Sequence, residues 1–241
     1  LPRPIVLHAS GTGGDLERRL RGAVRGELLF DRASRGRYST DASIYQVEPV
    51  GVLVPASHED VRAAFDVCRE LRIPMLPRGA GSSQCGQTVG RALVVDHSKR
   101  LAGVVAFDRE ARTVTVEPGL VLDALNAWLK PHGLWFPVDV STSAQCTLGG
   151  MAGNNSCGSR SIRYGNMVHN VASIDALLMN GERARFGSAR PEDMPAAVRD
   201  APSPNSTMPP SLIVSRPKPT ATSATARIIK SRRDGCSLMS I

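Results

Sequence analysis

The chain has 241 residues, of which 41% are hydrophobic and 22% charged, and its formal net charge is +8. This composition is typical of a globular protein and excludes a collagen-like or wholly disordered chain. No apolar run approaches the roughly 18–20 residues that a membrane-spanning helix needs, so we expect no such helix in this sequence.

The five cysteines are widely separated, and none forms a CxxC pair or lies at zinc-finger spacing with a histidine. This pattern predicts reduced thiols in a cytoplasmic protein and no metal site. The apolar stretch at residues 5–7 is too short for the core of a signal peptide. Although the net charge is basic, the basic residues are not interleaved with aromatic ones, so we expect no nucleic-acid partner.

The N-terminal part, residues 1–44, is predicted to be a helical lead-in. Between residues 15 and 30, apolar side chains recur every four positions, at Leu16, Leu20, Val24 and Leu28. That period predicts an amphipathic helix over this range. Its polar face is rich in arginine, which we interpret as a solvated helix face.

The middle of the chain alternates strand and helix signals, which predicts an α/β fold. A strand is expected at 51–55, followed by a helix that Ser57 caps, with Asp60 at its third position. The buried stripe of that helix is expected to be Val61, Ala64, Phe65, Cys68 and Leu71. Further strands are expected at 73–76 and 92–95, which completes a β-α-β unit.

Two hairpins and a helix are expected after this unit. The first hairpin pairs 104–107 with 113–117, and a helix follows at 121–129. The second hairpin pairs 171–179 with 183–186 through a tight turn at Asn180 and Gly181.

The character of the sequence changes near residue 188. All ten aromatic residues precede this point, whereas eight of the 17 prolines follow it. Such a segment buries too little apolar surface to offset its ordering entropy, so residues 188–241 are predicted to be a largely disordered tail. The basic run at 227–233 is interpreted as part of that solvated tail rather than as a binding patch.

The first segment that suggests a ligand is the glycine-rich stretch at 77–86, Pro-Arg-Gly-Ala-Gly-Ser-Ser-Gln-Cys-Gly, which follows a predicted strand. Glycines let successive backbone N–H groups converge on an anion, so the stretch suits a diphosphate. It is neither a Walker A loop nor a GxGxxG dinucleotide fingerprint. Taken alone it is a weak signal, because short glycine loops are often ordinary turns.

The second such segment covers residues 147–158, Thr-Leu-Gly-Gly-Met-Ala-Gly-Asn-Asn-Ser-Cys-Gly, and leads to Tyr164 and Gly165. Small residues let a backbone approach a flat ligand closely, while amides and hydroxyls supply hydrogen-bond donors and acceptors. A surface loop without a ligand is the alternative interpretation.

With the Tyr-Ser-Thr-Asp-Ala-Ser run at 38–43 and Phe-Pro-Val-Asp at 136–139, these two segments resemble the FAD-binding (PCMH-type) domain of the vanillyl-alcohol oxidase superfamily. The resemblance covers residues 15–187. It is nearest to the D-lactate, glycolate and D-2-hydroxyglutarate dehydrogenase branch, whose large FAD-linked oxidases carry an iron–sulfur domain downstream. It implies an α+β fold of two subdomains, at about 45–135 and 136–187, that clasp FAD.

The resemblance also implies which residues contact the cofactor and that FAD is held without a covalent bond, because Ser82 and Ser83 stand where some members have a linking histidine. Asp139 and Ser141 depart from the family's usual Pro-Asp-Pro-Ser form. The residues expected to bind FAD are Arg78, Gly79, Ala80, Gly81, Ser82, Ser83, Gly86, Pro137, Asp139, Ser141, Thr147, Leu148, Gly149, Gly150, Asn155, Gly158, Tyr164, Gly165 and Val171.

The family's cap domain and iron–sulfur clusters have no counterpart in this sequence, which begins with Leu, so we expect a truncated, frame-shifted or fragmentary chain. No catalytic base is assigned: the five histidines are interpreted as structural or solvated. The predicted function is the FAD-binding portion of an enzyme that moves hydride from a D-2-hydroxy acid to flavin, with a separate electron acceptor. The alternatives are the same fold reducing a nucleotide-sugar enol ether, and a non-catalytic remnant or basic binding module.

Overall fold

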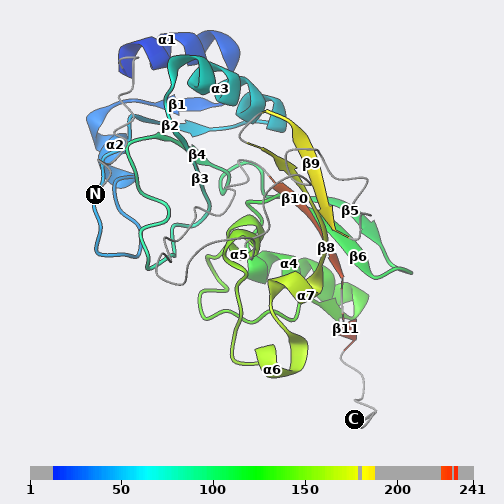
Figure 1. The fold of residues 1–241 in the computed structure, drawn as a ribbon. Helices are drawn as coiled ribbons and strands as arrows, with labels where there is room; N and C mark the ends of the chain where they lie inside the picture. Colours follow the sequence, from blue (N-terminus) through cyan, green and yellow to red (C-terminus); the bar gives the residue numbers. More distant parts are fainter. Residues whose placement is uncertain (1–12, 179–180, 188–223, 230, 233–241) are drawn as a thin grey trace, which may run out of the picture.

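The computed structural model describes residues 13–178, 181–187, 224–229 and 231–232, which form two lobes. We call residues 13–101 the first lobe, and residues 104–178, 181–187, 224–229 and 231–232 the second lobe. Figure 1 shows the first lobe at the upper left and the second at the lower right, with both of the described C-terminal strands in the second.

The first lobe is a four-stranded sheet with helices packed on it. Its strands lie in the order β1-β2-β4-β3. β2 (Gly51–Val54), β4 (Leu93–Asp96) and β3 (Met75–Arg78) are parallel, and β1 (Glu27–Leu29) pairs antiparallel with β2 at the edge. α3 (His58–Leu71) connects β2 to β3, and α1 (Gly13–Ala23) packs against α3 (Figure 1). α2 (Arg32–Arg37) follows β1. The β-α-β unit predicted from the sequence is confirmed.

The sequence explains why α3 begins where it does. The Ser57 hydroxyl accepts a hydrogen bond from the Asp60 backbone N–H at 3.4 Å, as the predicted cap requires. The Asp60 carboxylate is buried, and it accepts from the backbone N–H of Arg25 at 2.9 Å and of Ala56 at 2.8 Å. One side chain therefore fixes the start of α3 and the chain that enters β1.

The second lobe is built on a five-stranded antiparallel sheet of order β5-β6-β10-β8-β9. Its strands are β5 (Val104–Asp108), β6 (Thr113–Val116), β8 (Val171–Leu177), β9 (Arg183–Gly187) and β10 (Ala224–Ile229). The two hairpins predicted from the sequence are confirmed as β5–β6 and β8–β9. In the second turn Gly181 has φ +87° and donates to the Leu178 carbonyl at 2.9 Å, while Asn180 lies outside the described residues.

Short helices complete the second lobe. α4 (Leu122–Leu129) is the helix predicted at 121–129, and η1 (Lys130–His132) extends it to β7 (Leu134–Trp135). The remaining elements are α5 (Leu148–Asn154), α6 (Ser161–Tyr164), α7 (Met167–Asn170) and β11 (Ser231–Arg232), which pairs with β7. In the described part of the chain, no helix has the length and apolar character needed to cross a membrane.

Most of the predicted tail at 188–241 lies outside the described residues. The exceptions are β10 and β11, which the sequence reading did not predict. β10 inserts between β6 and β8 and pairs antiparallel with both. A central strand of a sheet takes its stability from neighbours far away in the sequence, which local composition does not reveal.

Each lobe has its own apolar core. Leu16, Val61 and Leu93 belong to the first core, whereas Val114, Leu125 and Met167 belong to the second. The change between cores falls between residues 101 and 114, well before the boundary at 135 that the sequence suggested. The β5–β6 hairpin and α4 therefore belong with the second lobe, because their apolar faces pack on the chain that follows them.

The first predicted helix is shorter than expected. The periodic pattern at 15–30 predicted one helix, but α1 ends at Ala23 and residues 27–29 form β1. Leu28 continues the apolar period, yet it packs against the same core from a strand. Pairing of β1 with β2 outweighs helical periodicity at the end of the pattern. The strands predicted at 73–76 and 92–95 are observed one or two residues further on.

Replacing Asp60 with Ala should destabilise the fold by about 2–3 kcal/mol, because two backbone N–H groups lose their acceptor in a buried site. Chemical denaturation of Asp60→Ala measures this change. Glu59→Gln is the matched control, since Glu59 is its exposed neighbour in the same helical turn. Equal midpoints for the two variants would contradict the assigned role.

Candidate functional site

The first glycine-rich segment begins at the carboxyl end of β3 and leads toward β4. In open sheets with parallel strands, ligands bind in the crevice outside the carboxyl ends of the strands. Gly79, Gly81 and Ser82 are half-buried there, and Ala80 is exposed. The Ser83 hydroxyl donates to Gln87 Oε1 within the same loop. We call residues 79–88 the first loop.

The second glycine-rich segment forms a helix for half of its length. The sequence suggested a loop at 147–158, but Leu148–Asn154 is α5. The Thr147 hydroxyl caps it by accepting from the Gly150 N–H at 3.3 Å, and Asn155 ends it with φ +47°. The capping bond and the packing of Leu148 and Met151 in the second core together offset the poor helix propensity of the glycines.

The two segments meet at the junction of the lobes. A Cβ on Gly79 would lie 2.1 Å from Thr147 Oγ1, so the backbone of the first loop touches the residue that caps α5. Gln87 Nε2 also donates to Asn154 Oδ1 at 3.4 Å. Figure 1 shows α5 on the side of the second lobe that faces β3 and β4. Residues nearly seventy positions apart in the sequence therefore form one site.

The Arg78 guanidinium bonds to three main-chain carbonyls next to this site. Its Nη1 donates to the Tyr38 carbonyl at 3.3 Å and to the Thr88 carbonyl at 3.2 Å, and its Nη2 donates to the Thr40 carbonyl at 2.8 Å. Tyr38 and Thr40 belong to a run that the sequence reading quoted but to which it assigned no role. Only a long-range contact identifies them.

Asp139 contacts other protein groups. Its carboxylate accepts from Ser159 Oγ at 2.9 Å and from Arg160 Nε at 2.8 Å. Burial tends to raise the pKa of Asp139, but the hydrogen bonds from Arg160 and Ser159 outweigh burial and keep the pKa below its usual value. Gly158 packs directly on the Asp139 carbonyl. The expected contacts at Asp139 and Gly158 therefore join two loops of the second lobe.

The other expected contacts differ in exposure. Pro137 and Leu148 are buried, Val171 and Gly149 are half-buried, and Ser141 and Gly150 are exposed. The Asn155 side chain accepts from the Val168 N–H at 3.0 Å, and so supports α7. The Tyr164 ring packs edge-on against Trp135, with centroids 5.3 Å apart. Gly165 follows with φ +74°, against the His169 ring, and Gly86 lies against the Tyr45 ring.

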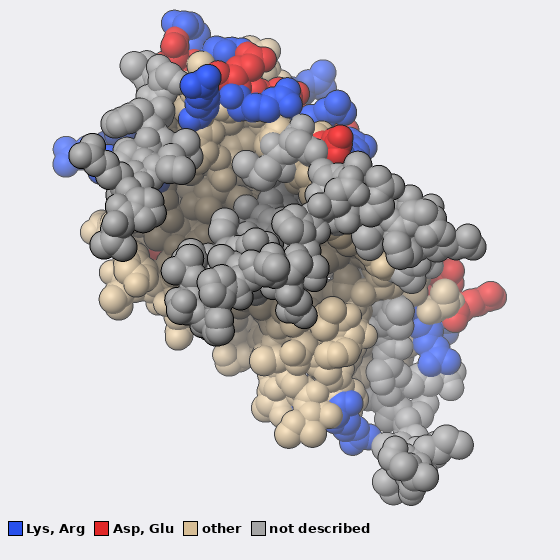
Figure 2. All heavy atoms as spheres, viewed as in Figure 1, with Lys and Arg blue, Asp and Glu red and all other residues tan. Residues whose placement is uncertain are grey.

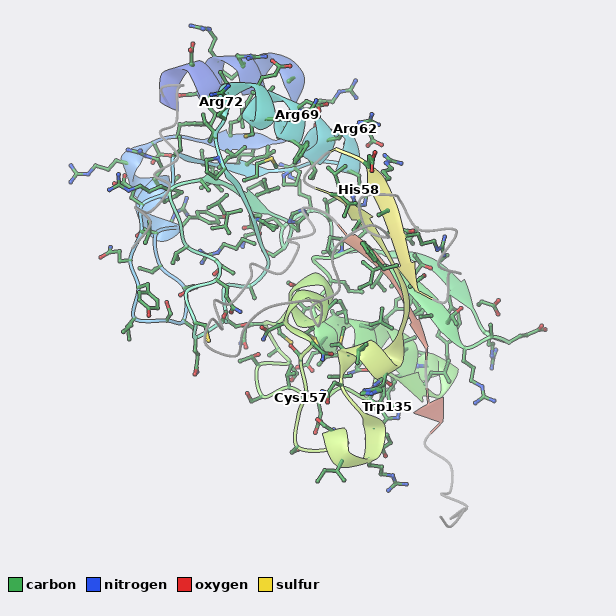
Figure 3. The ribbon with its side chains drawn as sticks, viewed as in Figure 1. His58, Arg62, Arg69, Arg72, Trp135 and Cys157 are labelled. Atoms are coloured by element: carbon green, nitrogen blue, oxygen red, sulfur yellow. The ribbon has the colours of Figure 1, made fainter. Side chains whose placement is uncertain are left out.

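The described histidines lie in or next to different elements, and His58 lies close enough to His97 that, besides burial, its charge lowers the pKa of that ring. His58 begins α3, and its Nε2 is 3.6 Å from Glu117 Oε1. Figure 3 shows His58 at the start of α3 in the first lobe, whereas Trp135 and Cys157 lie in the second. His132 packs against Phe107, and the His169 Nδ1 accepts from the Asn166 N–H at 3.0 Å. None of these contacts indicates a catalytic base.

His97 is the one deeply buried histidine in the described part of the chain. It follows β4, is 4% exposed, and its Nε2 has no hydrogen-bond partner among the described residues. Burial lowers the pKa of His97 to about 4, against the opposing effect of the neighbouring Asp96 carboxylate. The ring is therefore neutral at physiological pH and acts as part of the core.

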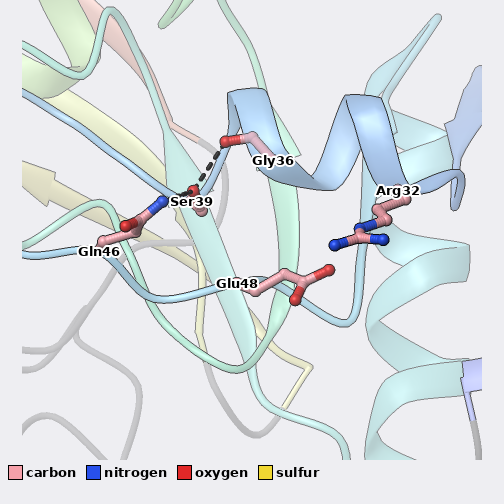
Figure 4. Close-up of a pocket in the computed structure, with 5 residues that line it drawn as sticks. All are labelled: Arg32, Gly36, Ser39, Gln46 and Glu48. Carbon is pink, nitrogen blue, oxygen red and sulfur yellow. Dashed lines mark hydrogen bonds between the residues drawn. The ribbon is translucent and has the colours of Figure 1, made fainter.

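A small polar hollow of about 320 Å³ lies beside α2, lined by Arg32, Gly36, Ser39, Gln46 and Glu48. Figure 4 shows the Arg32 and Glu48 side chains extending toward each other across it, with Ser39 bonded to the Gly36 carbonyl. Neither glycine-rich segment lines this hollow, so it is separate from the candidate site.

Charges on the surface are mixed in sign. Figure 2 shows basic and acidic side chains together over α1 and α3, and few charges on the lower part of the same face. Arg18 pairs with Asp15, Arg21 with Glu17, and Arg19 with Glu70. On this face the charges of the described residues form no single-sign stripe of the kind that typifies nucleic-acid binding. In the described part of the chain, four cysteines are free thiols and no group of side chains could hold a metal ion.

Comparison with known proteins identifies similar sequences. A family model described as "FAD binding domain" matches residues 49–187. The chain is 37% identical over 162 residues to D-2-hydroxyglutarate dehydrogenase of Pseudomonas putida, covering 66% of this chain and 16% of that protein. It is 34% identical over 179 residues to glycolate oxidase subunit GlcD of Bacillus subtilis, covering 71% of this chain and 37% of that protein. The chain thus spans a minor part of the length of both relatives.

A similar fold occurs in solved structures. Alkyldihydroxyacetonephosphate synthase matches with a TM-score of 0.70 at 18% identity, covering 90% of this chain and 39% of that one. At this identity the likeness concerns the fold alone. It confirms the two-lobed α/β architecture that the sequence predicted.

Replacing Gly79 with Ala should separate the first loop from α5, because the new Cβ would overlap Thr147 Oγ1. We expect overpacking to lower the free energy of unfolding of Gly79→Ala by about 1–3 kcal/mol. The thermal midpoint should therefore fall by several degrees. Gly153→Ala is the control, since a Cβ there meets nothing within 4 Å and Ala favours the helix. A midpoint for Gly79→Ala at or above that of Gly153→Ala would contradict this contact.

The stability of the chain should depend on pH through His97. Between the ordinary pKa of 6.5 and about 4, the unfolded chain binds a proton at His97 that the folded chain does not, so stability falls as the pH falls through this window. His97→Gln should remove a contribution of about 3 kcal/mol to this dependence. Urea unfolding of both proteins from pH 7 to pH 4 measures it, and parallel curves would refute it.

Proposed function

Because the chain belongs to the FAD binding domain family, we propose that it is the flavin-binding part of an oxidoreductase that oxidises a D-2-hydroxy acid. Two relatives support this substrate class through their names, D-2-hydroxyglutarate dehydrogenase and glycolate oxidase subunit. Since the chain matches 16% and 37% of their lengths, its own contribution to such an activity is the cofactor site.

The observation that carries the proposal is the meeting of the two glycine-rich segments. Gly79 contacts Thr147, and Gln87 bonds to Asn154, so the first loop and α5 border one site. Main-chain N–H groups and small side chains are the groups that let a pyrophosphate and a flat ring approach a backbone. The residues present therefore fit FAD.

Within this site we assign the pyrophosphate to the first loop, to the stretch 79–83 and Gly86. The flavin is assigned to Pro137 and to residues 147–150, and Ser141 lies at its margin. Asp139, Asn155, Gly158, Tyr164, Gly165 and Val171 support the second lobe around it. The first loop contains no histidine, which favours FAD held without a covalent bond.

Bound flavin supplies the acceptor for the hydride of the hydroxy acid's α-carbon. The chain's residues orient and hold the cofactor, and the N–H groups of the first loop balance part of the pyrophosphate's charge. The base that removes the hydroxyl proton and the group that pairs with the substrate's carboxylate are not assigned to residues of this chain. The electron acceptor is likewise not assigned to this chain.

Replacing Gly81 with Ala should weaken FAD binding, because Gly81 has φ +69° and its Cβ would lie 2.6 Å from Arg78 Nη2. The strain and the overlap with Arg78 should displace the loop from the shape that binds the pyrophosphate, so we expect affinity to fall roughly tenfold. Gly133→Ala is a matched control, with φ +68° and open space around its Cβ, and it lies outside both glycine-rich segments. Flavin fluorescence titration compares the two.

The decisive measurement for the proposed function is the visible spectrum of the purified chain after FAD is added and the excess removed. A retained flavin band that D-2-hydroxy acids bleach supports the whole proposal. A retained band that no hydroxy acid bleaches limits the chain to cofactor binding. A folded chain without the band overturns the proposal and favours a remnant that no longer binds flavin.

A further inference from the structure

The segment at 38–46 lies against the first loop along most of its length, and we call it the clasp. Its sequence, Tyr-Ser-Thr-Asp-Ala-Ser-Ile-Tyr-Gln, precedes β2 and belongs to no long helix or strand. Thr40 and Gln46 form an isolated β-bridge, and the Val47 N–H donates to the Ser39 carbonyl at 2.8 Å, which closes the clasp on itself.

The guanidinium of Arg78 joins the clasp to the first loop. It donates to the carbonyls of Tyr38 and Thr40 in the clasp and to the carbonyl of Thr88 at the end of the first loop. The guanidinium carbon also lies 5.3 Å from the centre of the Tyr38 ring. A planar fork of fixed donors suits three carbonyls in different directions, whereas an ammonium group does not reproduce that arrangement.

Asp41 attaches the clasp to the same end of the first loop, at Thr88. Its Oδ2 accepts from the Thr88 hydroxyl at 2.9 Å, and its Oδ1 accepts from the Ser43 N–H at 2.8 Å. Burial tends to raise the pKa of Asp41, but the hydrogen bonds from Ser43 and Thr88 outweigh burial and lower the pKa. The carboxylate is therefore ionised at neutral pH, and Thr88 is held by both Asp41 and Arg78.

Two more contacts join the clasp to the first loop. The Ala42 N–H donates to the Gly81 carbonyl at 2.9 Å, in the middle of the first loop. The Tyr45 ring lies over Gly86, where a Cβ would be 2.5 Å from its Cδ2. The Tyr38 hydroxyl donates to Asp96 Oδ2 at 2.6 Å, which ties the start of the clasp to the end of β4.

From these contacts we propose that Arg78 and Asp41 are positioning residues, which fasten the clasp to the first loop and so set the loop's shape for the pyrophosphate of FAD. Arg78 acts through the main chain of the clasp and loop, not as a ligand of the phosphates. This inference rests on the proposed FAD site and adds to it a third segment, far from both glycine-rich segments in sequence.

The test compares FAD affinity across a set of variants by fluorescence titration. Asp41→Asn should weaken binding roughly tenfold, and Arg78→Gln roughly 10- to 100-fold. Arg78→Lys keeps the charge but loses the fork, so it should bind FAD nearly as weakly as Arg78→Gln. Arg109→Gln and Glu110→Gln, both exposed in the β5–β6 turn, are controls matched in charge and should bind as the unaltered chain does.

Coupling between the two residues separates positioning from direct contact. Because both fasten the same pair of segments, Arg78→Lys combined with Asp41→Asn should weaken binding no more than Arg78→Lys alone. Additive losses, or a harmless Asp41→Asn, would overturn the proposal. So would full retention of affinity in Arg78→Lys, since that result would indicate a charge acting on phosphate directly.

Amide hydrogen exchange without FAD gives a readout that does not depend on the cofactor. Arg78→Lys and Asp41→Asn should speed exchange at Ala42 and in the first loop, with the β5–β6 hairpin unchanged. Thr88→Val removes only the hydroxyl that donates to Asp41, so it serves if an Arg78 variant fails to fold. If the unaltered chain fails to bind FAD, the proposed function fails, whereas unchanged exchange in the variants refutes the fastening itself.

Discussion

The close contact between Gly79 and Thr147 is the constraint on which the rest of the site depends. Thr147 caps α5 in the second lobe, and Gly79 begins the loop that leaves β3 in the first. Because Gly79 has no side chain, the backbone of the first loop packs directly on the Thr147 side chain that caps α5. A ligand that spans the lobes can therefore meet main-chain groups from both.

Packing between the lobes supports this contact. Leu177, at the end of β8, packs in the core of the first lobe although its strand belongs to the sheet of the second. Asp60 fixes α3 and the chain entering β1 through two buried hydrogen bonds. β3 pairs with β4 as far as Arg78, so the first loop starts from a strand that is hydrogen-bonded to its end.

Residues expected to contact the cofactor divide into two groups in the structure. Gly79, Gly81 and residues 147–150 lie where the segments meet. Arg78, Asp139 and Asn155 form hydrogen bonds that join segments of the protein to one another. A charged or amide side chain beside a glycine-rich loop looks the same in a sequence whether it binds a ligand or supports the loop, because only its partner distinguishes the two.

By itself the sequence determined the β-α-β unit, the two hairpins, the cap at Ser57 and the two glycine-rich segments, since these depend on local periodicity, capping and turn residues. The family resemblance rests on the same local motifs. Tertiary structure decided that α1 ends at Ala23, that β10 lies between β6 and β8, that residues 104–129 belong to the second core, and that Arg78 bonds to the clasp. These features arise from contacts between residues far apart in the chain, whose energies outweigh local preference and leave no pattern in it.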